Sequence, residues 1–140
     1  MAASDEDIRE ILNETKTIAL IGWSPKPERP SHRVANYLVQ QGYRVIPVNP
    51  GHSGTVVPWG EVVCGALSEI DVPVDMIDIF RKSDAVPLVV DEALQHFPDL
   101  KTIWMQLGVV HDGAAAKAMA ADVAVVMNRC PAIEIPRLFA

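Results

Sequence analysis

Hydrophobic residues along the chain occur in two patterns that alternate from one end to the other. Mainly apolar runs of about 4–8 residues predict strands buried on both faces, whereas apolar positions that recur every three or four residues predict helices with one buried side. The runs that predict strands lie at residues 17–21, 43–48, 75–80, 102–106 and 123–127, with a shorter one at 55–57. The helical patterns occupy residues 1–15, 31–42, 84–96 and 113–121, and a short helix or turn is expected between Pro131 and Pro136.

Polar residues at the expected helix starts predict where the helices begin, because a side-chain oxygen there can accept a hydrogen bond from a free backbone N–H. Ser4 followed by Asp7 predicts a capping box at the first helix. Ser31, Ser83 and Asp112 are the expected caps of the three helices that follow.

The alternation of strands and helices predicts an α/β fold, in which a mostly parallel sheet of about five strands lies between two layers of helices. Pro47 cannot donate a backbone hydrogen bond, so we expect either the second strand at an edge of the sheet or Pro47 at the end of that strand. In such sheets ligands bind beyond the carboxyl ends of the strands. The strand-end segments that this rule selects are Gly22–Ser24, Val48–Pro50, Phe80–Arg81, Gln106–Gly108 and Asn128–Cys130.

Length and composition indicate one ordinary globular domain. The 140 residues are 49% hydrophobic and 21% charged, and we expect residues 1–140 to form a single domain that includes the N-terminal helix. Twelve basic and 18 acidic residues give a net charge of −6, which argues against nonspecific binding to nucleic acid or to an anionic membrane. The chain shows no signal peptide pattern and no apolar run near the ~20 residues of a membrane span. A cytoplasmic protein is therefore expected.

The residues that usually carry catalysis or bind metals do not form recognisable motifs. Four histidines and two cysteines lack the spacing of metal ligands, so no metal site is expected. Neither a Gly-x-Ser-x-Gly elbow nor a Walker phosphate loop occurs. Asp75 and Asp78 are expected as charges at strand ends. The sequence thus predicts no catalytic acid, base or nucleophile.

The loop after the first predicted strand has features of a phosphate site. Gly22 at the strand end allows the backbone to approach a phosphate group, and Ser24 supplies a hydroxyl. The dinucleotide motif Gly-x-Gly-x-x-Gly is incomplete, because Ser24 and Pro27 stand at its second and third glycine positions. No carboxylate follows the second strand at Val48–Pro50 to hold the ribose of NAD. The sequence therefore disfavours ordinary NAD binding.

Positive charge is concentrated in the first half of the chain. No Asp or Glu occurs from Arg29 through Gly60, and residues 23–60 carry four cations against Glu28, a local charge of +3. The four cations are Lys26, Arg29, Arg33 and Arg44. A guanidinium group can bind two phosphate oxygens at once, so a small polyanionic ligand is expected. The alternative is a solvated surface with an uneven distribution of charge.

Six short motifs occur in a recognisable order. They are the Gly22-x-Ser24 loop, the run Glu28–Arg33, Val48–Pro50, Ile79–Arg81, Trp104-x-Gln106-x-Gly108 and Asn128–Cys130. Together they resemble the small single-domain CoA-binding proteins of the YccU-like branch, which is related to the CoA-binding domain of the succinyl-CoA synthetase alpha subunit. The resemblance covers about residues 8–139 and implies a Rossmann-like fold that holds CoA across its strand ends.

The resemblance also implies which residues contact the cofactor. Gly22 and Ser24 are expected at the pyrophosphate, Val48–Pro50 at the adenosine, and Phe80 with Arg81 on the opposite side of the cleft. The complete implied set is Gly22, Trp23, Ser24, Pro25, Lys26, Arg29, Ser31, Val48, Asn49, Pro50, Phe80, Arg81, Gln106, Gly108, Asn128, Arg129 and Cys130. The family usually has a small residue in place of the tryptophan, whose side chain would shield or shift the phosphate loop.

A non-catalytic module that binds CoA or an acyl-CoA is the function expected from these features. The alternatives are a nicotinamide- or adenine-nucleotide-binding enzyme, a small acyl-CoA transferase, and a regulatory module that acts with a protein partner or as a homo-oligomer. Cys130 beside Arg129 suggests a further hypothesis, a mixed disulfide between its thiol and CoA. The alternative for Cys130 is a small, partly buried apolar side chain.

Overall fold

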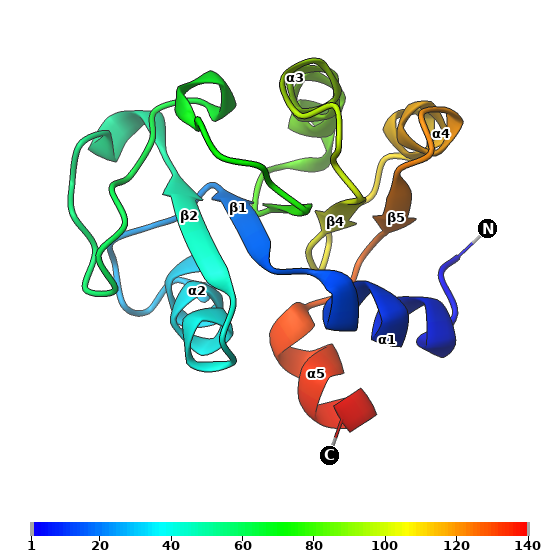
Figure 1. Cartoon of the computed structure of the whole chain (residues 1–140), viewed down its shortest axis with the longest axis horizontal. Helices are drawn as coiled ribbons and strands as arrows, with labels where there is room; N and C mark the ends of the chain where they lie inside the picture. Colours follow the sequence, from blue (N-terminus) through cyan, green and yellow to red (C-terminus); the bar gives the residue numbers. More distant parts are fainter. Residues whose placement is uncertain (1, 140) are drawn as a thin grey trace.

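A computed structural model describes residues 2–139 of the chain (Figure 1). The strands form one five-stranded sheet in the order β2-β1-β3-β4-β5, and every neighbouring pair is parallel. The strand bounds are β1 Thr17–Ile21, β2 Arg44–Val48, β3 Met76–Ile79, β4 Thr102–Met105 and β5 Ala124–Val126. The predicted α/β fold with a parallel sheet of about five strands is confirmed.

Helices cover both faces of the sheet, which gives three layers (Figure 1). The helices on one face are α1 (Asp5–Glu14), α2 (Pro30–Gln40) and α5 (Pro131–Phe139), and those on the other are α3 (Val86–His96) and α4 (Asp112–Ala120). Short 3-10 turns occur at η1 (Pro50–His52), η2 (Leu67–Glu69) and η3 (Ser83–Ala85). Within residues 2–139, no helix combines the length and the apolar character needed to cross a membrane.

Side chains from the sheet pack into two apolar layers, one on each face. Ile18 and Leu20 of β1 belong to the layer under α1, α2 and α5, whereas Ala19 and Ile21 belong to the layer under α3 and α4. All of them are at most 5% exposed. Successive side chains of a strand point to opposite faces, so a strand covered on both faces is apolar at nearly every position. This explains the mainly apolar runs of the sequence.

The edge position predicted for the strand with Pro47 is confirmed, since β2 is the first strand of the sheet. Along its outer side runs the segment 55–64, whose Cys64 N–H donates to the Pro47 carbonyl (3.0 Å). The short strand expected at 55–57 is wrong. That segment makes an isolated bridge between Val56 and Val62, in a turn-rich stretch too short for a ladder.

For the first two helices, the observed N-terminal caps agree only in part with the predicted ones. The capping box of α1 is confirmed, because the Asp7 N–H donates to the Ser4 hydroxyl (3.1 Å) and the Ser4 N–H donates to the Asp7 carboxylate (3.0 Å). The cap predicted for α2 is wrong. Arg29 is its N-cap, Pro30 is its first residue and Ser31 lies inside the first turn. Proline fits this position because its φ is helical and its missing N–H is not needed there.

The caps predicted for the third and fourth helices are also wrong. Ser83 opens the 3-10 turn η3, and its hydroxyl accepts from the Val110 N–H (3.0 Å) instead of capping α3. His111 caps α4, where its ring Nδ1 accepts from the Ala114 N–H (3.0 Å), and Asp112 is the first helical residue. In both cases a neighbouring group forms a hydrogen bond that the sequence alone does not reveal.

The carboxyl-terminal helix is longer than predicted, since α5 continues through Pro136 instead of ending there. A proline inside a helix removes one backbone hydrogen bond. Contacts on the buried side of α5 offset this loss: the Glu134 carboxylate accepts from Arg137 (2.6 Å) and from Arg129 (3.1 Å). Arg137 also pairs with Asp5 of α1 (2.7 Å). These ion pairs hold the two ends of the described chain together.

The strand order places a topological switch point between β1 and β3, because the chain leaves these neighbours toward opposite faces of the sheet. At their carboxyl ends Gly22 lies directly against the backbone of Phe80. Gly22 has a φ of +85°, and a Cβ added to it would lie 2.3 Å from the Phe80 carbonyl oxygen. Both facts require glycine. Ligands of doubly wound sheets bind at this kind of position.

Replacing Gly22 by alanine is expected to lower the free energy of unfolding by about 3 kcal/mol, from the clash with Phe80 and the positive φ together. Gly54→Ala is the matched control, since Gly54 also has a positive φ (+90°) but an added Cβ there would have no atom within 4 Å. The control is expected to lose about 1 kcal/mol. Urea unfolding measures the free energy of unfolding of both variants. An equal loss in the two would contradict a special cost of the close approach between Gly22 and Phe80.

Candidate functional site

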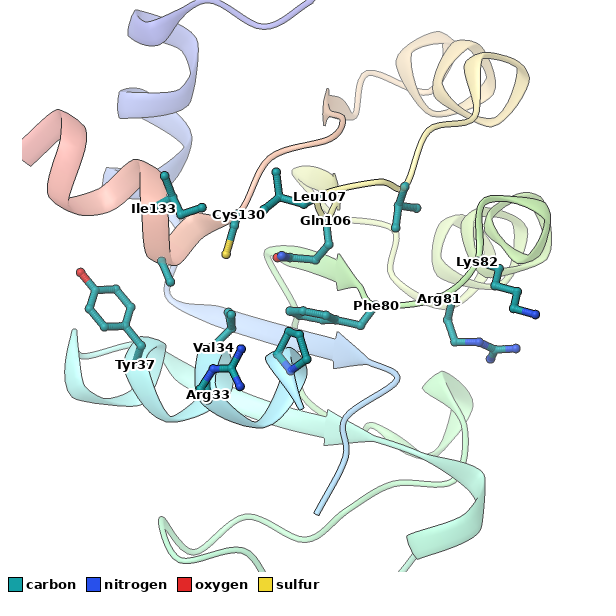
Figure 2. A pocket seen from close by; sticks show the side chains of 13 residues that line it. Arg33, Val34, Tyr37, Phe80, Arg81, Lys82, Gln106, Leu107, Cys130 and Ile133 are labelled. Atoms are coloured by element: carbon teal, nitrogen blue, oxygen red, sulfur yellow. The ribbon is translucent and has the colours of Figure 1, made fainter. Parts of the chain in front are cut away.

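Two adjoining cavities open at the carboxyl ends of the strands, over the switch point. The larger has a volume of about 940 Å³ and the smaller about 750 Å³. Phe80 and Arg81, the two residues after β3, line both of them. Figure 2 shows the Phe80 ring reaching back over the sheet toward α2, whereas Arg81 extends the opposite way. We refer to the two cavities together as the cleft.

Helices α2 and α5 form the walls of the larger cavity (Figure 2). Val34 and Tyr37 of α2 face Ile133 of α5, so segments far apart in the sequence meet across this space. Gln106 follows β4 and Cys130 precedes α5, and the two side chains are directed into the cavity between the helices. Most of the lining is aliphatic or aromatic. The larger cavity therefore suits an apolar ligand group.

The smaller cavity lies between the end of β2 and α3. Val48–Pro50 lines one side, Leu88 lines the other, and Gly22 also lines this cavity. Two carboxylates, Asp84 and Glu92, add polar groups to this part of the cleft. The smaller cavity is thus more mixed in character than the larger one.

Three cations border the cleft without carboxylate partners. Arg33, Arg81 and Lys82 line the larger cavity, and none of them forms an ion pair with any other residue among 2–139. Five other cations, such as Arg44 with Glu61, are paired, whereas Arg9, Lys16, Lys26 and Arg29 are also unpaired within residues 2–139 but line neither cavity. Unpaired cations beside a cavity create a local positive potential that attracts anions, even on a protein of net negative charge.

The predicted site residues divide into two groups. Those that line the cleft are Gly22, Val48, Asn49, Pro50, Phe80, Arg81, Gln106 and Cys130. Those that line neither cavity are Trp23, Ser24, Pro25, Lys26, Arg29, Ser31, Gly108, Asn128 and Arg129. The strand-end residues thus come together, whereas most of the loop after Gly22 lies outside the cleft.

The loop after β1 is held in place by Asn49 and by the burial of Trp23. The Trp23 side chain is 3% exposed within the apolar layer under α2, and its ring stacks on His32 with 6.0 Å between the ring centres. The Asn49 side-chain amide donates to the Trp23 carbonyl (2.6 Å), and its oxygen accepts from the Gly51 N–H (2.8 Å). Trp23 therefore packs beneath the loop instead of covering the cleft.

Several other predicted residues make contacts that stabilise loops. The Ser24 hydroxyl accepts from the Lys26 N–H (3.2 Å), which is the geometry of a turn. Asn128 accepts from the Gly108 N–H (2.7 Å) and joins the loops after β4 and β5. Arg129 pairs with the buried Glu134, as described above. A contact between these residues and a ligand stays a prediction.

Sequence reasoning did not assign the α2 side of the cleft to the site, although a signal was present. Pro30, Arg33, Val34 and Tyr37 recur at helical spacing, so they share one side of α2, and all of them line the larger cavity. That this side faces the cavity depends on the packing of α2 beside α5, which the sequence does not show.

Asp78 was expected as a charge at a strand end, and this is wrong. It lies within β3 between Leu20 of β1 and Trp104 of β4, and it is 0% exposed. One head atom of the Gln106 side chain lies 2.8 Å from its Oδ1 and 3.2 Å from its Oδ2. Burial raises the pKa of Asp78 well above its ordinary value. A single acidic residue inside an otherwise apolar run was the sequence signal for this buried group.

The sequence from residue 16 to residue 136 matches the protein family described as CoA binding domain. The chain belongs to this family. The resemblance to small single-domain CoA-binding proteins is confirmed. Within the family, the uncharacterized protein YneT of Bacillus subtilis (strain 168) is 35% identical over 127 residues, which cover 91% of this chain and 90% of that protein.

Solved structures share this fold over nearly the whole chain. A structure from Thermus thermophilus is 36% identical with a TM-score of 0.90, covering 98% of this chain and 100% of that one. A hypothetical protein from Pyrococcus horikoshii OT3 is 37% identical with a TM-score of 0.90, covering 99% and 94%. The dinucleotide forming acetyl-coenzyme A synthetase 1 of Ca. Korarchaeum cryptofilum, 20% identical with a TM-score of 0.67, shares the fold over 83% of this chain and 26% of its own.

The buried Asp78 predicts a specific dependence of stability on pH. The folded state keeps a proton on Asp78 that the unfolded chain releases above about pH 4, so stability falls as pH rises from there, by at most about 1.4 kcal/mol per pH unit. Asp78→Asn places a neutral group of similar shape there. We expect this variant to be more stable than the native protein at pH 7, with a difference that shrinks toward pH 4. Urea unfolding at several pH values measures this, with the exposed Asp91→Asn as the control.

Parallel pH profiles for the native protein and Asp78→Asn would contradict a neutral Asp78 in the folded state. Because only the difference between the two proteins is compared, other titrating groups contribute equally to both profiles and cancel.

Proposed function

We propose that this member of the CoA-binding domain family binds CoA or an acyl-CoA across the carboxyl ends of its parallel sheet, as a non-catalytic module. The observation that carries the proposal is the placement of unpaired Arg33, Arg81 and Lys82 beside a long, two-part cleft at the switch point. CoA combines a polyphosphate with two less polar ends, and such a ligand suits a cleft with Arg81 between its two cavities and Arg33 and Lys82 along the larger one.

The two cavities suggest how the ligand is oriented. The adenosine would occupy the smaller cavity beside Val48–Pro50, and the pyrophosphate would cross the cleft near Gly22 and Arg81. The pantetheine arm would then enter the larger cavity between α2 and α5. Close backbone approach at Gly22 and a guanidinium that can bind two oxygens are both suited to a phosphate group.

Binding without catalysis is proposed because of what lines the cleft. Its side chains are aliphatic, aromatic, cationic and amide groups, together with Cys130 and the two carboxylates of the smaller cavity. Each of these groups can contact a bound ligand without taking part in a chemical step. The mixed disulfide between Cys130 and CoA stays a separate hypothesis; Cys130 lines the larger cavity and is 6% exposed.

Isothermal titration with CoA, dephospho-CoA, ADP and NAD tests the ligand class. We expect CoA to bind more tightly than NAD by about tenfold or more, because the cleft has cations for phosphates and the end of β2 has no carboxylate for the NAD ribose. Tight binding of NAD with no binding of CoA would overturn the proposal and favour a nicotinamide-dependent protein.

Arg81→Ala is expected to weaken CoA binding by about 10- to 100-fold, the range for hydrogen bonds to a charged group. Lys117→Ala is the matched control, since it also removes one positive charge but lies on α4, where Lys117 pairs with Asp91 (2.5 Å). The control is expected to bind CoA as the native protein does. Equal losses in the two variants would indicate an effect of net charge and count against the assigned position of the phosphates.

A further inference from the structure

The charged side chains that line the cleft are divided unequally between its two cavities. The larger cavity is lined by cations and by no carboxylate, whereas the smaller is lined by Asp84 and Glu92 together with Arg81, the cation that both cavities share. Neither carboxylate forms an ion pair with any residue among 2–139. Their negative charge therefore acts directly on whatever occupies the smaller cavity.

Helical spacing explains why this charge faces the cavity. Ala85, Leu88 and Glu92 recur at intervals of three and four residues, so they share one side of the segment that runs from η3 into α3, and all of them line the smaller cavity. Asp84 lines the same cavity from η3. The carboxylates thus belong to the wall opposite Val48–Pro50, beside which we propose that the adenosine lies.

A third carboxylate lies against the lining of the same cavity. Oε1 of Glu69 in η2 accepts from the N–H of Gly65 (3.2 Å), and Gly65 lines the smaller cavity. A Cβ added to Gly65 would lie 2.8 Å from the other carboxylate oxygen of Glu69. Around the smaller cavity, Arg81 is therefore set against three acidic side chains.

The charge around the smaller cavity bears on one group of CoA, the phosphate on the 3′ oxygen of its ribose. Dephospho-CoA differs from CoA only in having a free hydroxyl at this oxygen. A phosphate monoester carries a charge of about −1.5 to −2 at neutral pH. Carboxylates that outnumber the cations around a cavity repel such a group, whereas they do not repel a neutral hydroxyl.

We infer that the smaller cavity selects an adenosine whose 3′ hydroxyl is free, so that the cleft prefers dephospho-CoA and its thioesters to CoA and acyl-CoA, with Asp84 and Glu92 as the specificity-determining residues. This inference rests on the proposed function, because that proposal assigns the adenosine to the smaller cavity. The pyrophosphate and the pantetheine arm are common to both ligands. The cations of the larger cavity therefore favour the two ligands equally through these shared groups.

Titration of the native protein with CoA and dephospho-CoA tests the preference without any substitution. We expect dephospho-CoA to bind about three- to tenfold more tightly in about 0.1 M salt, because the 3′-phosphate of CoA is repelled in the smaller cavity. The ratio of the two affinities is expected to approach one in about 1 M salt, where the screening length falls to about 3 Å.

A double variant, Asp84→Asn with Glu92→Gln, tests the assigned residues, because each amide keeps the shape of the carboxylate but is neutral. We expect the affinity for CoA to rise by about three- to tenfold and the affinity for dephospho-CoA to change by less than about twofold. The matched control is Asp99→Asn with Glu10→Gln, which neutralises two exposed carboxylates that line neither cavity. The control is expected to keep the native ratio. A ratio of two affinities within one protein retains its meaning when a variant is somewhat less stable.

The outcomes separate this inference from the proposed function. Equal affinities of the native protein for the two ligands, or tighter binding of CoA, would overturn the selection at the 3′ position and leave CoA binding in place. A preference that persists in the Asp84→Asn, Glu92→Gln variant, or that the control loses equally, would overturn the assigned residues. Failure of both ligands to bind would overturn the proposed function and this inference with it.

Discussion

β1 and β3 lie side by side, yet the chain leaves β1 for α2 on one face of the sheet and β3 for α3 on the other. A parallel sheet has no hairpins, so both departures occur at the same edge, where Gly22 and Phe80 come into backbone contact. Consecutive side chains of extended backbone point to opposite sides, so the Phe80 ring and the Arg81 guanidinium extend in opposite directions (Figure 2). The division of the cleft into a larger apolar part and a smaller mixed part follows from this arrangement, since these two residues lie between them.

The sequence predicts well those features that depend on one strand or helix alone. Burial on both faces requires a mainly apolar strand, so each core strand was visible as a run, and the missing N–H of Pro47 placed β2 at an edge. Helix starts were less predictable because several groups compete for the same free N–H donors. Ser31 does not cap α2, because the helix already begins at Pro30. Ser83 does not cap α3, because its hydroxyl accepts a hydrogen bond from Val110, in a loop distant in the sequence.

The same distinction applies to the candidate site. The rule that ligands bind at strand ends selects Gly22, Phe80 and Gln106 from sequence alone, and all of them line the cleft. The opposite wall depends on how α2 packs beside α5, a contact between segments nearly a hundred positions apart, so Tyr37 and Ile133 could not be assigned. Asp78 was misjudged for a related reason: its neutral state depends on neighbours in β1 and β4 rather than on adjacent residues.

α5 follows all five strands in the chain, yet it forms one wall of the larger cavity and is tied through Arg137 to Asp5 of α1. Without α5 the larger cavity lacks a wall, and the apolar side of α1 lacks one of its packing partners. The larger cavity is consequently complete only when α5 is packed against α1 and α2. A ligand seated in it would bind only to molecules whose first and last helices have already come together.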